Sequence, residues 1–202
     1  MQPEDSLLLA RAALVREKAT FTGVIGGDAV RPRVEIQMAQ SDGTWLTIAR
    51  ARAHSSGAFT AQWRATEAGR FNVRAVAAGS SGAGGAATAV LSVMNRTVAT
   101  WYDQAGSTTA CGVKLDAATL GVAHKSLPCG TVLEFGFRGR TVTAPVIDRG
   151  PYSKGVSYDL TVAAAKQIRF VSTGRGTVGV LPSATPLSAP SPAPGIAASH
   201  GR

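Results

Sequence analysis

The sequence is poor in cysteine and aromatic residues, and it contains no long apolar run. Its 202 residues include 2 Cys, and aromatic residues make up 6% of the chain. Two cysteines cannot supply the framework of a disulfide-rich mini-protein. No apolar run reaches the ~18 residues that a membrane-spanning helix needs, so no integral membrane segment is expected. Because 45% of the residues are hydrophobic, general disorder is not expected either, and the length suits one large or two small domains.

Acidic residues are also scarce. The 12 Asp and Glu residues face 21 Lys and Arg residues, which gives a formal net charge of +9. A basic surface favours an acidic partner, such as nucleic acid, anionic lipid or an acidic cell-wall polymer. The basic residues are spread along the chain instead of forming blocks, and few aromatic residues accompany them. A dedicated nucleic-acid-binding module is therefore not expected.

Residues 1–12 form an N-terminal segment in which no export signal is visible. Residues 1–5 are acidic, and the apolar stretch 6–10 is too short for a signal-peptide core. Arg11 and Arg16 follow this stretch, whereas a signal peptide places its positive charge before the core. The sequence leaves three alternatives open: a cytoplasmic protein, a start that lies further upstream, or a leader that has been removed.

Residues 13–94 have the pattern of a small all-β unit. Turn signals such as Asp42-Gly43 and Ser56-Gly57 separate short segments in which apolar and polar residues alternate, at 33–38, 45–48, 59–63, 71–75 and 89–93. This pattern predicts an antiparallel sandwich that is similar to bacterial immunoglobulin-like domains. The Gly-rich segment 79–85 is predicted to be a flexible loop. The unit has no cluster of His, Cys or carboxylate residues, and His54 fits a solvated loop, so a spacer or adhesion role is expected.

Residues 95–181 have a different sequence pattern. Strand-like segments at 97–102, 131–137, 141–147 and 176–181 are joined by Gly- and Pro-rich loops. One helix is predicted from Val162 to about Arg169, because Thr161 can cap it and Ala163 to Ala165 are good helix formers. Residues 182–202 contain five of the ten prolines. They are predicted to form a disordered tail.

Five motifs in this second unit are distinctive in their order and spacing. They are Ala99-Thr-Trp-Tyr102, Thr109-Ala-Cys-Gly112, the segment 121–131, Val146-Ile-Asp-Arg-Gly-Pro-Tyr152 and Tyr158-Asp-Leu-Thr161. Together they resemble the double-psi β-barrel domain of the rare lipoprotein A family, which includes septal lytic transglycosylases and is related to expansins. The resemblance implies an all-β chain: an immunoglobulin-like sandwich followed by a six-stranded double-psi barrel with one short helix.

The resemblance identifies Asp148 and His124 as catalytic residues. Asp148 ends an apolar strand next to a turn made by Gly150 and Pro151, so it is expected at a barrel mouth. Two alternatives remain open for Asp148, an ion pair with Arg149 or the capping of backbone amides. If Arg149 approaches Asp148, it lowers the pKa of that carboxyl group, whereas a proton donor needs a raised pKa. His124 lies in a loop and is either catalytic or a structural hydrogen-bonding residue.

Further residues are assigned to substrate binding by the same resemblance: Tyr102, Lys125, Arg149 and Asp159. Asp159 precedes the predicted helix, so it can instead complement the helix dipole. Trp101 is expected to be a core residue and Tyr102 to be more exposed, on the wall of a groove that Asp148 and His124 share.

Two departures from the family pattern concern the same region. The family has Glu directly after the Thr-Ala-Ser-Gly motif, and Val113 occupies this position. Cys111 and Cys129 flank the proposed groove and are expected to form a disulfide, with two reduced thiols as the alternative. Closing ~18 residues would stabilise the domain by about 3 kcal/mol. A zinc site of Cys111, His124 and Cys129 lacks a fourth ligand, so neither a metal nor a cofactor is expected.

The resemblance implies an endolytic transglycosylase that cleaves peptidoglycan glycan strands and leaves a 1,6-anhydro product. A carboxylic acid would protonate the glycosidic oxygen and then take the C6 hydroxyl proton. The alternative is a non-catalytic, expansin-like module that binds or loosens peptidoglycan or another acidic wall polysaccharide, a reading that Val113 favours. A third possibility is a secreted interaction protein in which the sandwich carries the function. A disulfide implies export, so a location in the cell envelope or outside the cell is expected. The protein is also expected to be a monomer.

Overall fold

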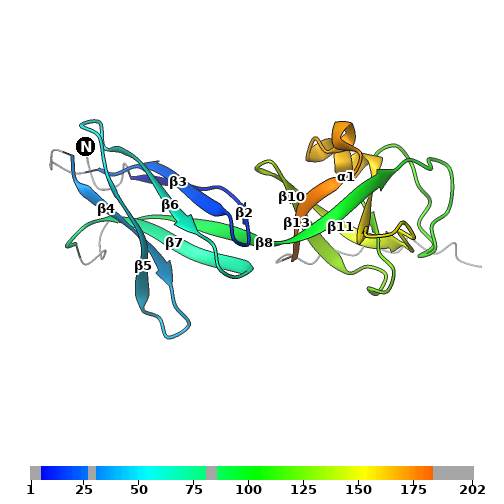
Figure 1. The fold of residues 1–202 in the computed structure, drawn as a ribbon, viewed down its shortest axis with the longest axis horizontal. Coiled ribbons are helices and arrows are strands. Elements are labelled where there is room, and N and C mark those ends of the chain that lie inside the picture. The colour runs from blue at the N-terminus through cyan, green and yellow to red at the C-terminus, as the bar shows by residue number, and fades with distance from the viewer. Residues whose placement is uncertain (1–5, 27–30, 81–85, 184–202) are drawn as a thin grey trace, which may run out of the picture.

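A computed structural model describes residues 6–26, 31–80 and 86–183. Two β domains lie end to end and are joined by one long strand, β8 (Figure 1). Most of the predicted tail at 182–202 and most of the predicted loop at 79–85 lie outside the described residues. Within the described part of the chain, no helix is long and apolar enough to cross a membrane.

The N-terminal domain is a sandwich of two sheets. The first sheet consists of β1 (Leu7–Ala10), β3 (Lys18–Val24) and β6 (Ala58–Arg64); the second consists of β5 (Trp45–Arg52), β4 (Arg33–Ala39), β7 (Gly69–Ala77) and β8 (Ala87–Tyr102), with β2 (Ala13–Leu14) parallel to β8. Alternate residues of both sheets meet in one core that includes Phe21, Phe59, Ile36 and Leu91. The alternation in the sequence predicted β4 to β8 but not β1 and β3. The immunoglobulin-like assignment remains a prediction.

The long strand β8 belongs to both domains. Its first part, from Ala87 to Val93, pairs with β7 of the sandwich, and its later part, from Asn95 onward, pairs with β13. The expected boundary at 94–95 therefore falls inside one continuous strand, and β1 lies before the expected start of the sandwich at residue 13.

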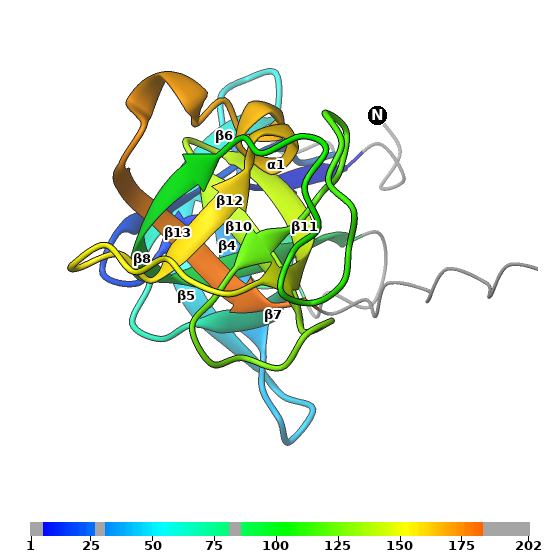
Figure 2. The same ribbon diagram turned by 90° about the vertical axis from the view of Figure 1, so that its right-hand side faces the viewer.

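The C-terminal domain is a barrel of six strands. The closed ring runs β8, β12 (Tyr158–Thr161), β9 (Val122–Ala123), β11 (Arg140–Asp148), β10 (Val132–Phe137) and β13 (Gly176–Pro182), and then returns to β8. Figure 2 shows the end of this barrel. Its core includes Phe135, Leu160 and Phe170, which are fully buried. The expected all-β fold with a six-stranded barrel is confirmed.

One α-helix stands out among the described residues. α1 (Val162–Gln167) begins where predicted, because the Thr161 hydroxyl accepts a hydrogen bond from the Ala164 amide. It ends slightly before the expected position and is followed by a short 3-10 helix, η2 (Val171–Thr173). Its alanine face, Ala163 to Ala165, is buried against the barrel.

Candidate functional site

Two strands of the barrel carry Asp148 and Asp159 on either side of one small residue. Ala123, at the end of β9, pairs with Asp148 of β11 and also with Asp159 of β12. Asp159 pairs in turn with Thr100 of β8. The β11 register shifts between Val146 and Asp148, and such a bulge redirects the side chain that follows it. The short strands β9 and β12, which periodicity did not predict, thus position both carboxyl groups.

Asp148 is held by backbone amides. Its Oδ1 accepts hydrogen bonds from the amides of Ala110 at 2.9 Å and Arg149 at 2.8 Å. Its carbonyl oxygen accepts a third from the His124 amide at 3.1 Å. The side chain is only partly buried, so a ligand can reach it. Of the two alternatives left open by the sequence, the structure contains amide capping.

Arg149 turns away from the carboxylate of Asp148. Its Nη1 donates to the carbonyl oxygens of Leu127 at 2.9 Å and His124 at 3.3 Å, and its Nη2 lies 3.2 Å from the Cys129 Sγ. Among the described residues, the ion pairs do not include Asp148. Arg149 therefore braces the loop that carries His124, and the proposed approach of its charge to Asp148 is not observed.

The expected disulfide between Cys111 and Cys129 is present, with the two Cα atoms 5.9 Å apart. It joins the loop of Ala110 to the loop of His124. The Cys111 amide also donates to the carbonyl oxygen of Ile147, the residue before Asp148, at 3.3 Å. The bridge thus fixes the two loops that surround Asp148. It stabilises the fold because it lowers the conformational entropy of the unfolded chain.

His124 is a hydrogen-bond acceptor at Nδ1. This atom accepts from the amides of Ser126 at 3.2 Å and Leu127 at 2.9 Å, which assigns the proton of the neutral ring to Nε2. Burial lowers the pKa of His124, and the charges of Arg149 and Lys125 lower it further. The ring also lies against Tyr158, with centroids 4.8 Å apart. His124 is therefore a neutral group with one N–H to offer, and Lys125 beside it is exposed.

Asp159 and Tyr102 form the more buried side of the site. Burial raises the pKa of Asp159, the hydrogen bond from the Thr100 hydroxyl at 2.7 Å opposes this shift, and the charge of Asp148 adds to it. Burial also raises the pKa of Tyr102, as do the nearby charges of Asp148 and Asp159. The Tyr102 hydroxyl is buried and has no hydrogen-bond partner in the described part of the chain. The expected exposure of Tyr102 is not found at this atom, and the residue as a whole is half-buried.

Trp101 has the predicted core position. It packs against the barrel core, and its indole N–H donates to the Val171 carbonyl at 3.0 Å. Val113 lies in the loop that contacts Asp148, since Thr109 exchanges hydrogen bonds with it and the Ala110 amide binds Asp148. A carboxylate at position 113 would therefore join the same loop.

Sequence reasoning missed two contributors. The Ala110 amide leaves no signal in the sequence, because any residue carries the same N–H group. Tyr152 follows Asp148 in the fourth motif and is 83% exposed, which makes its ring a candidate surface for a sugar face. The signal for Tyr152 was its place in the motif.

Residues 94–180 match the family described as "Lytic transglycolase". The barrel domain belongs to this double-psi β-barrel family. The resemblance inferred from the five motifs is thereby confirmed. Among curated relatives, the "Probable endolytic peptidoglycan transglycosylase RlpA" of Aquifex aeolicus is 40% identical over 83 residues, which are 39% of this chain and 37% of that protein. The endolytic peptidoglycan transglycosylase RlpA of Campylobacter jejuni is 35% identical over 85 residues, 40% of this chain and 31% of that protein.

The chain thus spans about a third of the length of these two relatives. The family match at residues 94–180 covers the barrel and not the sandwich. Among solved structures, the Streptomyces papain inhibitor is 26% identical and covers 43% of this chain and 94% of its own, with a TM-score of 0.36. That TM-score is too low to define a shared fold.

Proposed function

We propose that the barrel cleaves the glycan strands of peptidoglycan as an endolytic transglycosylase. The observation that carries the proposal is the position of Asp148, partly exposed at the end of β11 and oriented by two backbone amides. The family match and the names of the relatives support the reaction class. The disulfide supports a location outside the cytoplasm, in the cell envelope or secreted.

The reaction requires two proton transfers, one from the enzyme to the leaving group and one from the substrate back to the enzyme. A carboxylic acid protonates the bridging oxygen as the bond from C1 to that oxygen breaks. The C6 hydroxyl oxygen of the same sugar then bonds to C1, and its proton passes to the carboxylate. No water is consumed, and the sugar ends as a 1,6-anhydro ring. The enzyme finishes with the protonation state in which it began.

We assign the mobile proton to the pair of Asp148 and Asp159. The charge of Asp148 raises the pKa of Asp159, because a second negative charge is disfavoured near the first. Burial of Asp159 acts in the same direction. Tyr102 remains protonated near both groups, because burial and the charges of Asp148 and Asp159 raise its pKa. The raised pKa that a proton donor needs is thus found at Asp159.

The remaining residues are assigned to substrate positioning. His124 is neutral and offers its Nε2 proton to a sugar hydroxyl. Lys125 and the exposed ring of Tyr152 lie on the accessible side, where they can contact the strand. Arg149 acts indirectly by holding the His124 loop.

A non-catalytic, expansin-like binding module is the second candidate, and Val113 is the observation that favours it. A valine cannot transfer a proton or hold a sugar hydroxyl. If the missing Glu limits turnover, the protein binds glycan strands more robustly than it cleaves them, and any cleavage is strongest at mildly acidic pH, where the carboxyl pair keeps its proton.

The test is incubation with purified peptidoglycan, followed by mass spectrometry of 1,6-anhydro products. Asp148→Asn should lower their formation about a hundredfold or more. The exposed Asp103→Asn serves as the matched control. Unchanged product formation by Asp148→Asn would overturn the assignment of the site. Retained glycan binding without anhydro product in the unmodified protein would favour the second candidate.

The position of Val113 allows a gain-of-function test. Val113→Glu should raise product formation about tenfold or more, because it returns a carboxylate to the loop that contacts Asp148. Val113→Gln has the same length without the acid and is the control. Equal rates for the two variants, or rapid cleavage by the unmodified protein at neutral pH, would show that a carboxylate at position 113 does not matter.

A further inference from the structure

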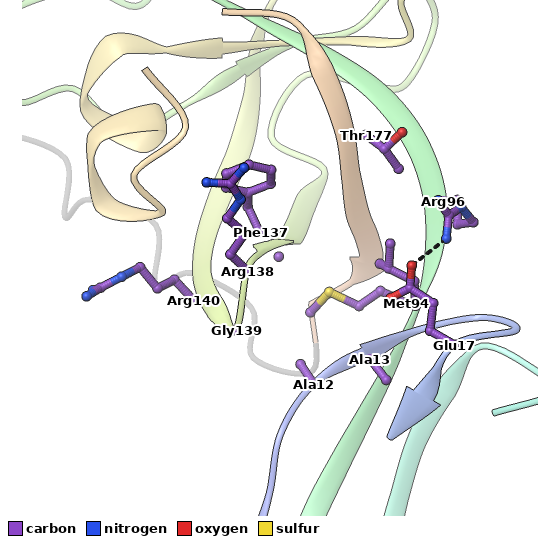
Figure 3. A pocket seen from close by; sticks show the side chains of 12 residues that line it. Ala12, Ala13, Glu17, Met94, Arg96, Phe137, Arg138, Gly139, Arg140 and Thr177 are labelled. Atoms are coloured by element: carbon purple, nitrogen blue, oxygen red, sulfur yellow. Dashed lines mark hydrogen bonds and ion pairs between the residues drawn. The ribbon is translucent and has the colours of Figure 1, made fainter. Parts of the chain in front are cut away.

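A second concave site lies where the two domains meet. It is a cavity of about 290 Å³, lined by Leu14 and Glu17 of the sandwich, Met94 and Arg96 of β8, and Phe137 and Arg138 of the barrel (Figure 3). The hairpin between β10 and β11 forms one wall. Asp148 ends β11 at the other end, so the cavity lies roughly 27 Å from the candidate active site along the strand.

Arg138 occupies an unfavourable backbone conformation at the tip of this hairpin. Its φ is +47° and that of the following Gly139 is +78°. Two consecutive residues with positive φ form the turn that Asn-Gly or Gly-Gly normally occupies. This backbone conformation is unfavourable for an arginine, because its Cβ lies too close to the following carbonyl oxygen. The same conformation recurs at Arg169, so the backbone alone does not mark a site, and the surroundings of the Arg138 side chain decide.

The guanidinium of Arg138 is placed on a fixed aromatic ring. Its central carbon lies 5.0 Å from the centroid of Phe137, and Phe137 packs edge-on against Phe170 at 5.1 Å. Phe170 is fully buried in the barrel core, so the ring cannot move freely. A guanidinium stacked in this way keeps its N–H groups at its edge, where they can bind an oxyanion with two parallel hydrogen bonds.

The side chains around the cavity carry an excess of positive charge. Arg96 is already paired with Glu17, at 2.6 Å. Arg138 and Arg140, from the two sides of the hairpin turn, have no ion-pair partner among the residues that the structure describes. The site therefore attracts an anion. Glu17 disfavours a polyphosphate, because its own charge would repel the additional negative charges.

The rest of the lining suits a sugar. Leu14 and Met94 offer apolar surface, while Thr177 and Glu17 offer oxygen atoms to hydroxyl groups. Apolar walls with a few placed polar groups are typical of small-ligand sites. We propose that this junction cavity binds a carboxylate-bearing sugar unit of the wall polysaccharide, with Arg138 contacting the carboxylate.

This inference rests on the proposed function for its choice of polymer. A strand bound at the junction and at the Asp148 site would be held at two points. The second contact is then intramolecular, which raises the overall affinity for long strands without new contacts at the reacting bond.

The experiment is a calorimetric titration of the full chain carrying Asp148→Asn, which prevents cleavage during the measurement. One ligand is a peptide-free peptidoglycan oligosaccharide, whose lactyl groups end in free carboxylates. The other is a chitooligosaccharide of the same length, which lacks these groups. The first should bind more tightly, and Arg138→Gly should weaken it about tenfold without affecting the second. The difference should shrink as salt is added.

Arg169→Gly is the matched control. Arg169 is an exposed arginine of the barrel with a φ of +56°, so the change removes the same side chain from the same kind of backbone. Glycine relieves the backbone at both positions, so neither variant should lose stability. Equal affinities for Arg138→Gly and Arg169→Gly would overturn the proposal. So would equal binding of the two oligosaccharides, or binding confined to fragments that carry stem peptides.

The two proposals fail separately. Arg138-dependent binding without any 1,6-anhydro product from the unmodified protein would retain the junction site and remove the enzymatic function. Anhydro product with no effect of Arg138→Gly on binding would do the reverse.

Discussion

The Glu35 cluster of the sandwich and the Asp148 site of the barrel differ in where their polar side chains find partners. On the outer face of the sandwich, Glu35 accepts hydrogen bonds from Arg50, Thr47 and Gln37, so side chains satisfy one another. In the barrel, Asp148 and His124 accept from backbone amides of loops. A side-chain network on a regular sheet stabilises the sheet. A carboxylate fixed by loop amides is oriented for a ligand, which is the arrangement that a functional site requires.

The two domains also have separate cores. Phe21 belongs to the first and Phe135 to the second, and both are fully buried. The domains are joined by β8 and by the ion pairs of Arg70 with Glu134 and of Arg96 with Glu17. Arg70 also donates a hydrogen bond to the Pro182 carbonyl at 2.6 Å. The first question is therefore whether the domains unfold independently.

Matched core substitutions would answer it. Phe21→Ala and Phe135→Ala should each cost about 3–5 kcal/mol, because each leaves a large cavity. We expect each change to lower mainly the thermal transition of its own domain, as followed by calorimetry. Equal shifts of both transitions by either variant would show that β8 and Arg70 join the domains into one cooperative unit.

Removal of the disulfide should have a smaller effect on stability, and this effect should be confined to the barrel. Replacing Cys111 and Cys129 by Ser should cost the barrel about 3 kcal/mol, because the bridge closes a loop with a sequence separation of 18. The sandwich transition should not move. Glycan binding should also weaken, since the loops that hold Asp148 and His124 lose their link. Reduction of the unmodified protein is the control, and unchanged binding after reduction would contradict this coupling.

The sandwich was largely predictable because its strands alternate. Val34, Ile36 and Met38 turn inward with period two, and the Asp42-Gly43 turn sets the next strand. β1 was missed because Leu7 to Ala10 has no alternation, and Leu7 and Leu9 are exposed at the edge of the sheet. β3 was overlooked although it alternates, with Ala19 and Phe21 buried.

The residues of the candidate barrel site could be named from the sequence, but their contacts could not. The motifs singled out Asp148, His124 and Asp159, and the disulfide was expected because Cys111 and Cys129 flank the proposed groove. Periodicity could not reveal β9, which is two residues long. The direction of Arg149 was also beyond the sequence, because it depends on carbonyl groups that only the folded loop presents.

The smallest expected effects concern pH, and they have opposite signs in the two domains. The hydrogen bond from Arg50 lowers the pKa of Glu35 below its ordinary value of 4.5. The folded sandwich therefore gains stability from this group above about pH 4.5 and loses it as the pH falls through the lowered pKa. Glu35→Gln should lower the sandwich transition slightly at pH 7, and this difference should shrink as the pH falls below 4.5.

Asp159 should show the reverse, because burial raises its pKa above the ordinary value of 3.8. Below about pH 3.8 the carboxyl group is protonated in both the folded and the unfolded state, so its ionisation does not change the free energy of unfolding. As the pH rises, the unfolded chain ionises first, so the folded barrel loses stability until the raised pKa is passed. Asp159→Asn cannot ionise, and its Oδ1 can still accept from Thr100. It should therefore raise the barrel transition by a few degrees at pH 7, leave it unchanged at pH 3, and lower the formation of anhydro product. Thermal melts across this pH range, with Asp103→Asn as control, decide the point: a lower transition at pH 7 would mean that the charge of Asp159 stabilises the site and that the proton lies elsewhere.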